Sequence, residues 1–268
     1  MREDGQIGAV KKAMDMLRVI SDAPNGEIGL KKLSEATGIP KTTCIHILNT
    51  LCAGDFAERV GRHGNYALGP MAHYVTRNGK YQQDLIRLCY PVMRWLNRQT
   101  GQTVLLSVLN KNGKYIVHYI NGERPLSYKG SIYLGHVFET ATGRALFSNL
   151  DEERRAEFLR TNGMPTVHQW PEAVTPASMR QEMEHIRAKG YVVVPVELED
   201  KLDIGIGAPI FGSMGVVGAI GIAMRYVLKE ESMPEEEIRG YVQNLLKCIR
   251  EINHRLVFED EEEKDPSR

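Results

Sequence analysis

The feature that most constrains this chain is a pair of short helical segments, separated by a glycine, near its start. Apolar side chains recur at helical spacing over residues 30–37 and again over residues 41–53. Gly38 follows the first segment, where a helix commonly ends in a left-handed residue, and Ile39–Pro40 forms the connector. This arrangement is typical of a helix-turn-helix. The side chains expected to face inward are Leu30, Leu33, Ala36, Cys44, Ile47, Leu48 and Leu51.

The flanking residues extend this pair to a winged helix-turn-helix. A preceding helix is predicted over residues 7–23, and a Pro-Asn-Gly turn ends it. Two short strands, 56–60 and 66–68, flank residues 61–65, whose glycines and asparagine indicate a hairpin tip. We therefore expect a first domain over residues 1–69. The apolar residues that give the preceding helix its spacing are Val10, Met14, Leu17 and Ile20.

The second helix of the pair has the chemistry of a DNA-reading helix. In a helix-turn-helix this helix enters the major groove with its N-terminus first. Amide, imidazole and ammonium groups bind base edges or phosphates, and an aliphatic group contacts a thymine methyl. A small helical domain that binds another protein is an open alternative. The expected DNA-binding residues are Lys41, Thr42, Thr43, Ile45, His46 and Asn49 on this helix, with Arg62 and His63 at the hairpin tip.

The rest of the chain predicts a second domain of mixed helices and strands. Residues 70–100 have a helical pattern and are interpreted as a linker. Residues 101–258 alternate strands with helices, which gives an α/β (α+β) fold class. Within them, Thr175–Pro176 is predicted to cap and begin one helix. Residues 259–268 are mostly acidic and are expected to form a disordered tail.

Composition and charge indicate which partners and which cellular compartment to expect. The formal net charge is zero, so global charge gives no argument for or against a nucleic-acid partner. No run of about 18 or more apolar residues occurs, so no membrane partner is expected. The polar start of the chain does not resemble a signal peptide. The four cysteines are scattered without a CxxC pair, which predicts neither a disulfide framework nor a zinc ribbon and favours the cytoplasm.

Three separate segments together resemble the IclR-type family of bacterial transcription regulators. The first, LKKLSEATGIPKTTCIHILNTLCAGDFAERVGRHGNYALG, is similar to the family's N-terminal domain. The second, GSIYLGHVFETATGRALFSNL, resembles its glycine-rich effector-domain signature, and the third, LDIGIGAPIFGSMGVVGAIGIAM, its final strand pair. The resemblance covers roughly residues 7–255. It implies a winged helix-turn-helix, a helical linker, a GAF-like effector-binding domain, a small-molecule effector, a palindromic operator in double-stranded DNA, and homodimers or homotetramers.

The sequence departs from the family pattern at four positions. The family often has Arg at the position of His46. In the second domain it often has Cys at the position of Gly205 and Ser at those of Gly221 and Ala223. In such members the Cys and Ser side chains help to bind small carboxylates. Smaller side chains leave more room and fewer donors, so we expect a larger or less polar effector, such as a ring-bearing or sugar-derived compound. The expected effector-binding residues are Tyr119, Gly130, Tyr133, Gly135, His136, Thr140, Ala141, Gly143, Asp203, Gly205, Gly221 and Ala223, with Tyr128 and Glu197 as further polar candidates.

Self-association is expected on geometric grounds as well. A single winged helix makes few base contacts, so useful specificity requires a two-fold pair of modules on a palindromic site. The pairing surface is expected on the first helix, at apolar residues that its core does not need, with Ile7 and Val19 among them.

No catalytic, metal or cofactor site is predicted. There is no GxSxG nucleophile elbow, and the spaced glycines of GIGAPIFG precede a strand instead of a phosphate-binding helix. His118 and His136 match no common spacing of metal ligands. Cys44 and Cys52 lie two turns apart on one helix, which fits core packing or a redox switch. The sequence favours a ligand-responsive repressor or activator of a catabolic operon; an enzyme built on the second domain and a protein–protein adaptor are the alternatives.

Overall fold

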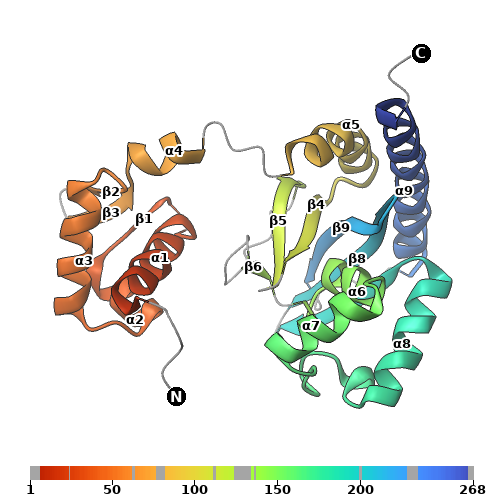
Figure 1. Ribbon diagram of the computed structural model, residues 1–268, viewed down its shortest axis with the longest axis horizontal. Helices are drawn as coiled ribbons and strands as arrows, with labels where there is room; N and C mark the ends of the chain where they lie inside the picture. The colour runs from red at the N-terminus through yellow and green to blue at the C-terminus, as the bar shows by residue number, and fades with distance from the viewer. Residues whose placement is uncertain are drawn as a thin grey trace. The chain divides into compact units, whose positions relative to one another are not determined.

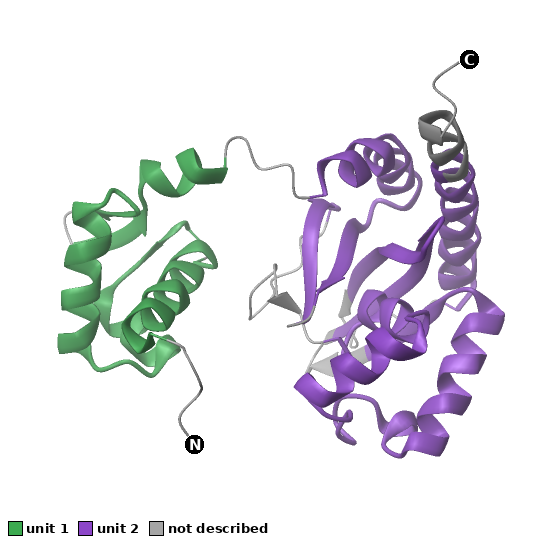
Figure 2. Ribbon diagram, in the orientation of Figure 1, with its two compact units in different colours: residues 1–81, 129–131 green, residues 82–128, 132–268 purple. Residues whose placement is uncertain are grey.

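The structure is a computed structural model of the whole chain. It describes residues 7–23, 25–61, 64–76, 82–110, 113–123, 134–135, 137–198, 201–227 and 235–264. The chain divides into two compact units, residues 1–81 with 129–131 and residues 82–128 with 132–268 (Figure 2). Each unit has its own hydrophobic core, so each is described separately.

The N-terminal unit combines three packed helices with a small antiparallel sheet, as a winged helix-turn-helix requires (Figure 1). The two helices of the pair begin and end at the predicted residues, whereas the first strand of the sheet was not predicted, because two residues show no periodicity. The sheet order is β1-β3-β2. The elements are α1 (Gly8–Ser21), β1 (Glu27–Ile28), α2 (Leu30–Thr37), α3 (Lys41–Ala53), β2 (Ala57–Val60), β3 (Asn65–Leu68) and α4 (Pro70–Thr76).

The core of this unit confirms the inward face predicted for α3. Cys44 and Leu48 are fully buried, and Ile47 and Leu51 pack against them. In α2, Leu33 is buried as expected, and Leu30 packs against the same core. The expectation for Ala36 is wrong, since its side chain is exposed.

The spacing of apolar residues in α1 does not mark its core face. Met16 and Ile20 are fully buried, whereas Val10 is 51% exposed and Met14 is 59% exposed. The helix therefore carries apolar side chains on two sides, and only one side is covered within the unit.

The C-terminal unit is built on one six-stranded antiparallel sheet in the order β6-β5-β4-β9-β8-β7. Two pairs of consecutive strands are joined by short connections, with Asn110 paired to Gly113 and Gly212 paired to Gly215. The strands are β4 (Thr103–Asn110), β5 (Gly113–Ile120), β6 (Leu134–Gly135), β7 (Val192–Leu198), β8 (Lys201–Gly212) and β9 (Gly215–Val227).

Helices cover both faces of this sheet, as in a GAF-like α/β domain (Figure 1). Alternate residues of β4 point to opposite faces: Val104, Leu106 and Val108 join one core, whereas Leu109 packs against the other. The first core is completed by α5 (Gln83–Thr100) and α9 (Glu235–Lys264). The second is completed by α6 (Ala141–Ser148), α7 (Glu152–Asn162), the 3-10 turn η1 (Pro171–Ala173) and α8 (Pro176–Lys189).

The predicted cap of α8 is confirmed. The Thr175 hydroxyl accepts the backbone N–H of Ser178 at 3.1 Å, and the Ser178 hydroxyl accepts the N–H of Thr175 at 3.2 Å. This reciprocal pair is a capping box, and Pro176 occupies the first helical position.

Two predicted boundaries differ from the structure. Residues 70–100 do not form one linker, because α5 buries Leu88, Val92 and Leu96 in the C-terminal core, while α4 contacts β2 of the N-terminal unit. The predicted tail 259–268 is helical as far as Lys264, since glutamate favours a helix and the end of α9 is rich in it. Among the described residues, no helix combines the length and apolar character needed to cross a membrane.

Candidate DNA interface and effector site

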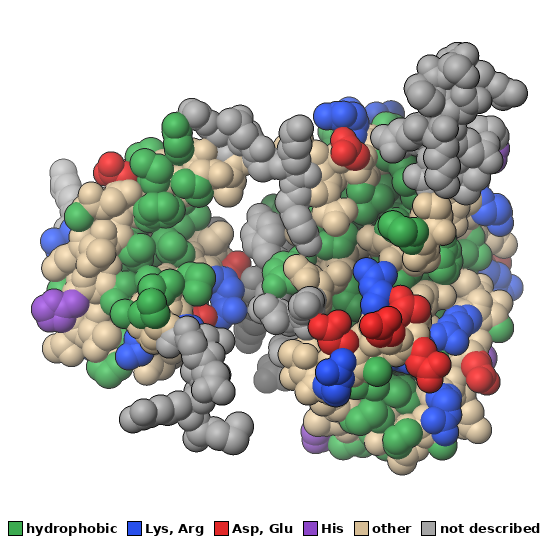
Figure 3. Space-filling view, viewed as in Figure 1, with side chains coloured by type: hydrophobic (Ala, Val, Ile, Leu, Met, Phe, Trp, Pro, Cys, Tyr) green, Lys and Arg blue, Asp and Glu red, His purple; other side chains and the backbone are tan. Residues whose placement is uncertain are grey.

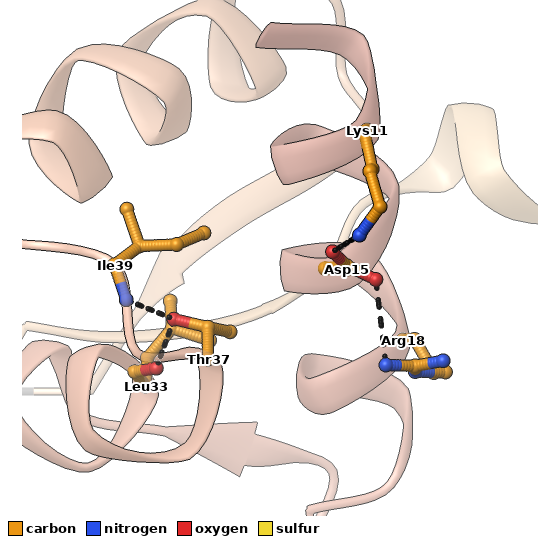
Figure 4. Close-up of polar contacts among 6 residues, drawn as sticks. All are labelled: Lys11, Asp15, Arg18, Leu33, Thr37 and Ile39. Carbon is orange, nitrogen blue, oxygen red and sulfur yellow. Dashed lines mark hydrogen bonds and ion pairs between the residues drawn. The ribbon is translucent and has the colours of Figure 1, made fainter. Parts of the chain in front are cut away.

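The turn between α2 and α3 is held by side-chain hydrogen bonds (Figure 4). The Thr37 hydroxyl donates to the carbonyl of Leu33 at 2.8 Å and accepts the N–H of Ile39 at 3.3 Å. Between them Gly38 has φ of 67°, a left-handed conformation that glycine adopts without a steric penalty. The Ser34 hydroxyl donates to the carbonyl of Ile39 at 2.7 Å. These bonds fix the direction in which α3 leaves the turn.

One face of α3 is exposed and carries most of the residues predicted from the sequence to bind DNA. This face lies opposite the buried side chains of Cys44 and Leu48. Thr43, at the edge between the two faces, is partly buried. The exposed side chains are Lys41, Thr42, Ile45, His46 and Asn49.

The hairpin after α3 is present, with Arg59 paired to Tyr66 across β2 and β3. Its tip residues Arg62 and His63 lie outside the described residues. Their side chains are therefore assigned to DNA from the sequence alone.

The two cysteines of α3 are in environments that suppress thiol reactivity. Burial raises the pKa of the Cys44 thiol and also that of Cys52. Cys44 donates its S–H to the carbonyl of Ile39 at 3.4 Å. Because the thiolate is the reactive form, a raised pKa favours the packing interpretation over a redox switch.

In the C-terminal unit, the first turn of α6 lies directly on strands β8 and β9. A Cβ atom on Gly207 would stand 2.5 Å from the carbonyl carbon of Ala141, and one on Gly221 would stand 2.5 Å from Cγ2 of Thr142. A Cβ on Gly143 would stand 2.1 Å from a backbone carbonyl oxygen of the preceding loop. Side chains do not pack at such distances, so these glycines permit the close contact between α6 and the sheet.

The expectation that Gly205 and Gly221 make room for a larger effector is therefore wrong. The Thr142 side chain fills the space over Gly221, and Cβ of Ala141 lies 3.3 Å from the position of a Cβ on Gly205. The small residues accommodate the protein's own helix. They give no reason to expect a bulkier or less acidic ligand.

Beside α6, the same sheet face carries an apolar cluster that includes two predicted effector residues. Leu105, Ile116 and Ala223 are buried together, and Tyr119 packs against them. The structure thus brings Tyr119 and Ala223 together, next to strands that α6 covers. This cluster is the candidate contact for an apolar part of an effector.

Asp203, another predicted effector residue, is engaged by a strand neighbour. Its carboxylate accepts two hydrogen bonds from Arg225, at 2.7 Å each, between paired positions of β8 and β9. Both side chains are largely buried. A bidentate pair of this kind is strong and directional, so the Asp203 carboxylate already links β8 to β9 without any ligand.

A buried polar cluster lies against the first turn of α6, and sequence reasoning missed it. The Lys114 ammonium donates to the Thr142 hydroxyl at 3.4 Å, and the Ser107 hydroxyl donates to the same oxygen at 3.2 Å. All three side chains are buried. Thr140 caps this turn by accepting the N–H of Gly143 at 3.3 Å. A lysine directly after a hairpin glycine reads as solvent-exposed, so only the fold could place Lys114 here.

Several predicted effector residues are not described fully enough to place. Gly135 pairs with Lys114 through its backbone in β6, and Glu197 lies in β7 without a described side chain. The remaining candidates lie outside the described residues: Tyr128, Gly130, Tyr133 and His136.

The N-terminal unit also exposes an apolar strip along α1, here called the α1 strip and made of Ile7, Val10 and Met14. Their exposed fractions are 70%, 51% and 59%. Figure 3 shows hydrophobic side chains gathered on this face of the unit. Val19, in contrast, packs against the N-terminal core. Nearby on α1, Asp15 pairs with Lys11 at 3.3 Å and Arg18 at 3.4 Å, exposed contacts that contribute little to stability (Figure 4).

A winged helix-turn-helix with an exposed polar helix face, joined to a separate α/β domain, is the architecture of a two-domain DNA-binding transcription regulator. The family described as "IclR helix-turn-helix domain" matches residues 9–61, and "Bacterial transcriptional regulator IclR C-terminal" matches residues 80–254. The chain therefore belongs to the IclR family of ligand-responsive, DNA-binding transcription regulators.

Curated relatives agree along most of the chain. Identity is 24% to the transcriptional repressor IclR of Escherichia coli K12, over 70% of this chain and 69% of the relative. Identity to the regulator KdgR of the same organism is also 24%, over 97% of this chain and 96% of the relative. Identity to the glycerol operon regulatory protein of Streptomyces coelicolor is 28%, over 85% of this chain and 90% of the relative.

Solved structures share the fold. An IclR homologue of Microbacterium hydrocarbonoxydans, complexed with 4-hydroxybenzoate, superposes with a TM-score of 0.67 at 19% identity, covering 93% of this chain and 99% of that one. Thermotoga maritima IclR superposes with a TM-score of 0.62 at 21% identity, covering 94% and 99%. At these identities the likeness concerns the arrangement of elements.

Proposed function

We propose that α3 reads an operator in the major groove of double-stranded DNA. The observation that carries this proposal is the exposed polar face of α3, fixed in direction by the Thr37 turn. His46 and Asn49 are assigned to base edges, Ile45 to a thymine methyl, and Lys41 with Thr42 to phosphates at the helix start. Arg62 and His63 at the hairpin tip are assigned to a flanking phosphate or the minor groove.

The second part of the proposal concerns the effector. We place it on the α6 side of the sheet, where the apolar cluster of Leu105, Ile116 and Ala223 adjoins the first turn of α6. An effector alters operator affinity only when it binds one arrangement of the DNA-binding units more tightly than another. In this role the chain acts in the cytoplasm as a repressor or activator of a catabolic operon, without catalysis.

The third part is self-association through the α1 strip. Ile7, Val10 and Met14 recur at intervals of three and four residues, so they form one face of a helix. An exposed apolar face of this kind is typical of a contact with another chain. A two-fold pair formed there would present two copies of α3 to a palindromic operator.

DNA reading is tested on the full chain by fluorescence anisotropy, with DNA from upstream of its own gene and from neighbouring operons. Asn49→Ala should reduce discrimination between the operator and a scrambled sequence by about 1–3 kcal/mol, as for one lost base contact. The matched control is Arg180→Ala, which changes an exposed residue of α8 in the other unit. Unchanged discrimination in both Asn49→Ala and His46→Ala would contradict the assignment of α3.

Pairing is tested by light scattering at micromolar concentration. A charge in the centre of the α1 strip should separate the chains, because a like charge from each copy would be buried. We therefore expect Val10→Glu to lower the molar mass and weaken operator binding, while Lys12→Glu, also exposed on α1, leaves the mass unchanged. A wild-type chain that is monomeric on DNA would contradict the pairing.

A further inference from the structure

The outer side of α5, in the C-terminal unit, carries a row of arginines. Arg87, Arg94 and Arg98 lie seven and four residues apart, close to whole turns of a helix, so they share one side. All three are exposed, whereas the buried residues of α5 join the core beneath it. The single acidic residue of α5 is Asp84, in the first turn, where a helix stabilises a carboxylate.

The neighbouring helix α9 runs antiparallel to α5 and adds a fourth cation. The Tyr241 hydroxyl, near the start of α9, lies 3.1 Å from the carbonyl oxygen of Thr100 at the end of α5. Further along α9, the ammonium of Lys247 lies 5.1 Å from the centre of the Trp95 ring. Trp95 and Arg98 are neighbours on the helix surface, three residues apart. We call the exposed side chains of Arg87, Arg94, Arg98 and Lys247 the basic face.

Most charges of the basic face have no carboxylate beside them. Among the described residues, only Arg87 forms an ion pair, with Asp84 at 3.6 Å, and both side chains are exposed. The guanidinium of Arg94 lies 5.8 Å from the centre of the Tyr90 ring. Aromatic rings thus orient Arg94 and Lys247 without neutralising them.

The helices on the other side of the sheet differ, because they mix both signs of charge. In α7 two glutamates are followed directly by two arginines, and in α8 Arg180 and Arg187 enclose Glu182 and Glu184. Figure 3 shows blue and red side chains interspersed over α7 and α8, whereas blue predominates over α5. Mixed charge is typical of a solvated surface, and a face of one sign attracts a polyanion.

The dimensions and chemistry of the basic face suit a DNA backbone. Arg87 and Arg98 are eleven residues apart, about 16 Å along the helix axis. A duplex carries one negative charge for about every 1.7 Å of its axis, so several phosphates fall within this length. Arginine is well suited to them, because its planar guanidinium can donate two parallel hydrogen bonds to one phosphate.

We propose that the basic face is a second DNA contact, which binds phosphates of the duplex beside the operator without reading its sequence. Because one chain joins the two units, a DNA-bound N-terminal unit keeps the basic face at a high effective concentration near the same duplex. The sensor unit would then add affinity that depends on its placement. This inference rests on the proposed binding of DNA by the N-terminal unit, but not on which residues of α3 read bases.

The test is fluorescence anisotropy of the full chain on a random-sequence duplex of about 40 base pairs, at several salt concentrations. The face variant combines Arg94→Gln, Arg98→Gln and Lys247→Gln. Its slope of log affinity against log salt should be smaller than that of wild type by about 2–3, because each lost phosphate contact removes about 0.9. Its affinity at low salt should fall at least about tenfold.

The matched control combines Arg160→Gln, Arg180→Gln and Lys189→Gln, which removes the same charge from exposed positions of α7 and α8. Its slope should equal that of wild type. Both triple variants should unfold at the wild-type temperature, because the substituted side chains are exposed. Should the face variant fail to fold, Arg98→Gln and Lys247→Gln are measured singly, and each should lower the slope by about 0.9.

Three outcomes would overturn the proposal. The first is a wild-type slope in the face variant, or in both single variants. The second is an equal loss of slope in the control, which would show an effect of net charge alone. The third is a wild-type slope together with a lower molar mass by light scattering, which would assign the face to a contact between copies of the chain.

A parallel measurement keeps this proposal separate from the proposed function. Discrimination between DNA from upstream of the chain's own gene and a scrambled sequence is measured for wild type and for the face variant. If wild type discriminates and the face variant keeps its salt slope, only the second contact fails. If wild type does not discriminate, operator reading fails, and the slopes on random-sequence DNA still decide whether the basic face binds phosphates.

Discussion

The polar side chains of the two candidate sites are held in opposite ways. The N-terminal unit presents Lys41, His46 and Asn49 on the outside of one helix. The C-terminal unit buries Lys114, Thr142 and Ser107 between a helix and a sheet. A DNA duplex is large and receives a protruding helix in its groove, whereas a small molecule is bound by being enclosed. This contrast matches the different sizes of the two classes of ligand, a DNA duplex and a small molecule.

The difference extends to what each site tolerates. The side chains on the α3 face are exposed, so they can change with little effect on folding. The effector side depends on the close contact of α6 with the sheet, in which glycines take part.

Gly143→Ala should destabilise the C-terminal unit by about 3 kcal/mol, because the new methyl group would meet a backbone carbonyl that cannot move aside. The measurement is thermal unfolding of the full chain. The matched control is Gly240→Ala in α9, where nothing lies within 4 Å, and which should stabilise by about 0.5–1 kcal/mol. Equal stability of the two variants would contradict the close contact.

Titration of Lys114 should make stability rise with pH above about 8. The pKa of this ammonium is about 8 in the folded chain, against about 10.4 in an unfolded one, so the unfolded state binds more protons in this window. The expected gain is about 1 kcal/mol between about pH 8 and about pH 9. Denaturant unfolding at both pH values measures it.

The control for this titration is Lys114→Met, because other groups change charge in the same range. The buried thiols of Cys89 and Cys248 have pKa values raised to about 12, and they act in the opposite direction. Only the difference between wild type and variant isolates the lysine. A difference that does not change with pH would count against a charged, buried Lys114.

The smallest effect is expected at the hairpin tip. Arg62→Ala should weaken binding to all DNA sequences about equally and reduce the slope of log affinity against log salt by about 1, as for one lost phosphate contact. Anisotropy at several salt concentrations measures the slope. Loss confined to one operator sequence would show that Arg62 reads a base instead.

The N-terminal unit could be predicted almost completely from sequence, and the reasons are local. The bounds of α2 and α3 follow from apolar spacing, and the turn follows from Gly38, all within adjacent residues. Even so, the apolar spacing of α1 runs through Val10 and Met14, which are exposed, because spacing alone cannot separate a face that meets the core from one that stays exposed.

The effector side could not be predicted in the same way, because its contacts join distant residues. Gly221 reads as open space until the fold places Thr142 over it. Lys114 reads as a surface residue until β5 is found between β4 and β6, with α6 above it. Family resemblance indicated the region through Thr140, Ala141 and Gly143, but not that α6 fills the space over Gly205 and Gly221.

The order of strands in the large sheet also determines when each unit completes its fold during synthesis. The central pair β4 and β9 joins residues more than a hundred positions apart, such as Leu105 and Gly221. In the N-terminal unit, the small sheet and the three helices packed with it come from residues 8–68 alone. Since the ribosome releases the N-terminus first, the DNA-binding unit folds while the sensor still lacks a central strand. Each new molecule therefore acquires the means to bind DNA before the means to sense a ligand, and remains tethered to the ribosome throughout that interval.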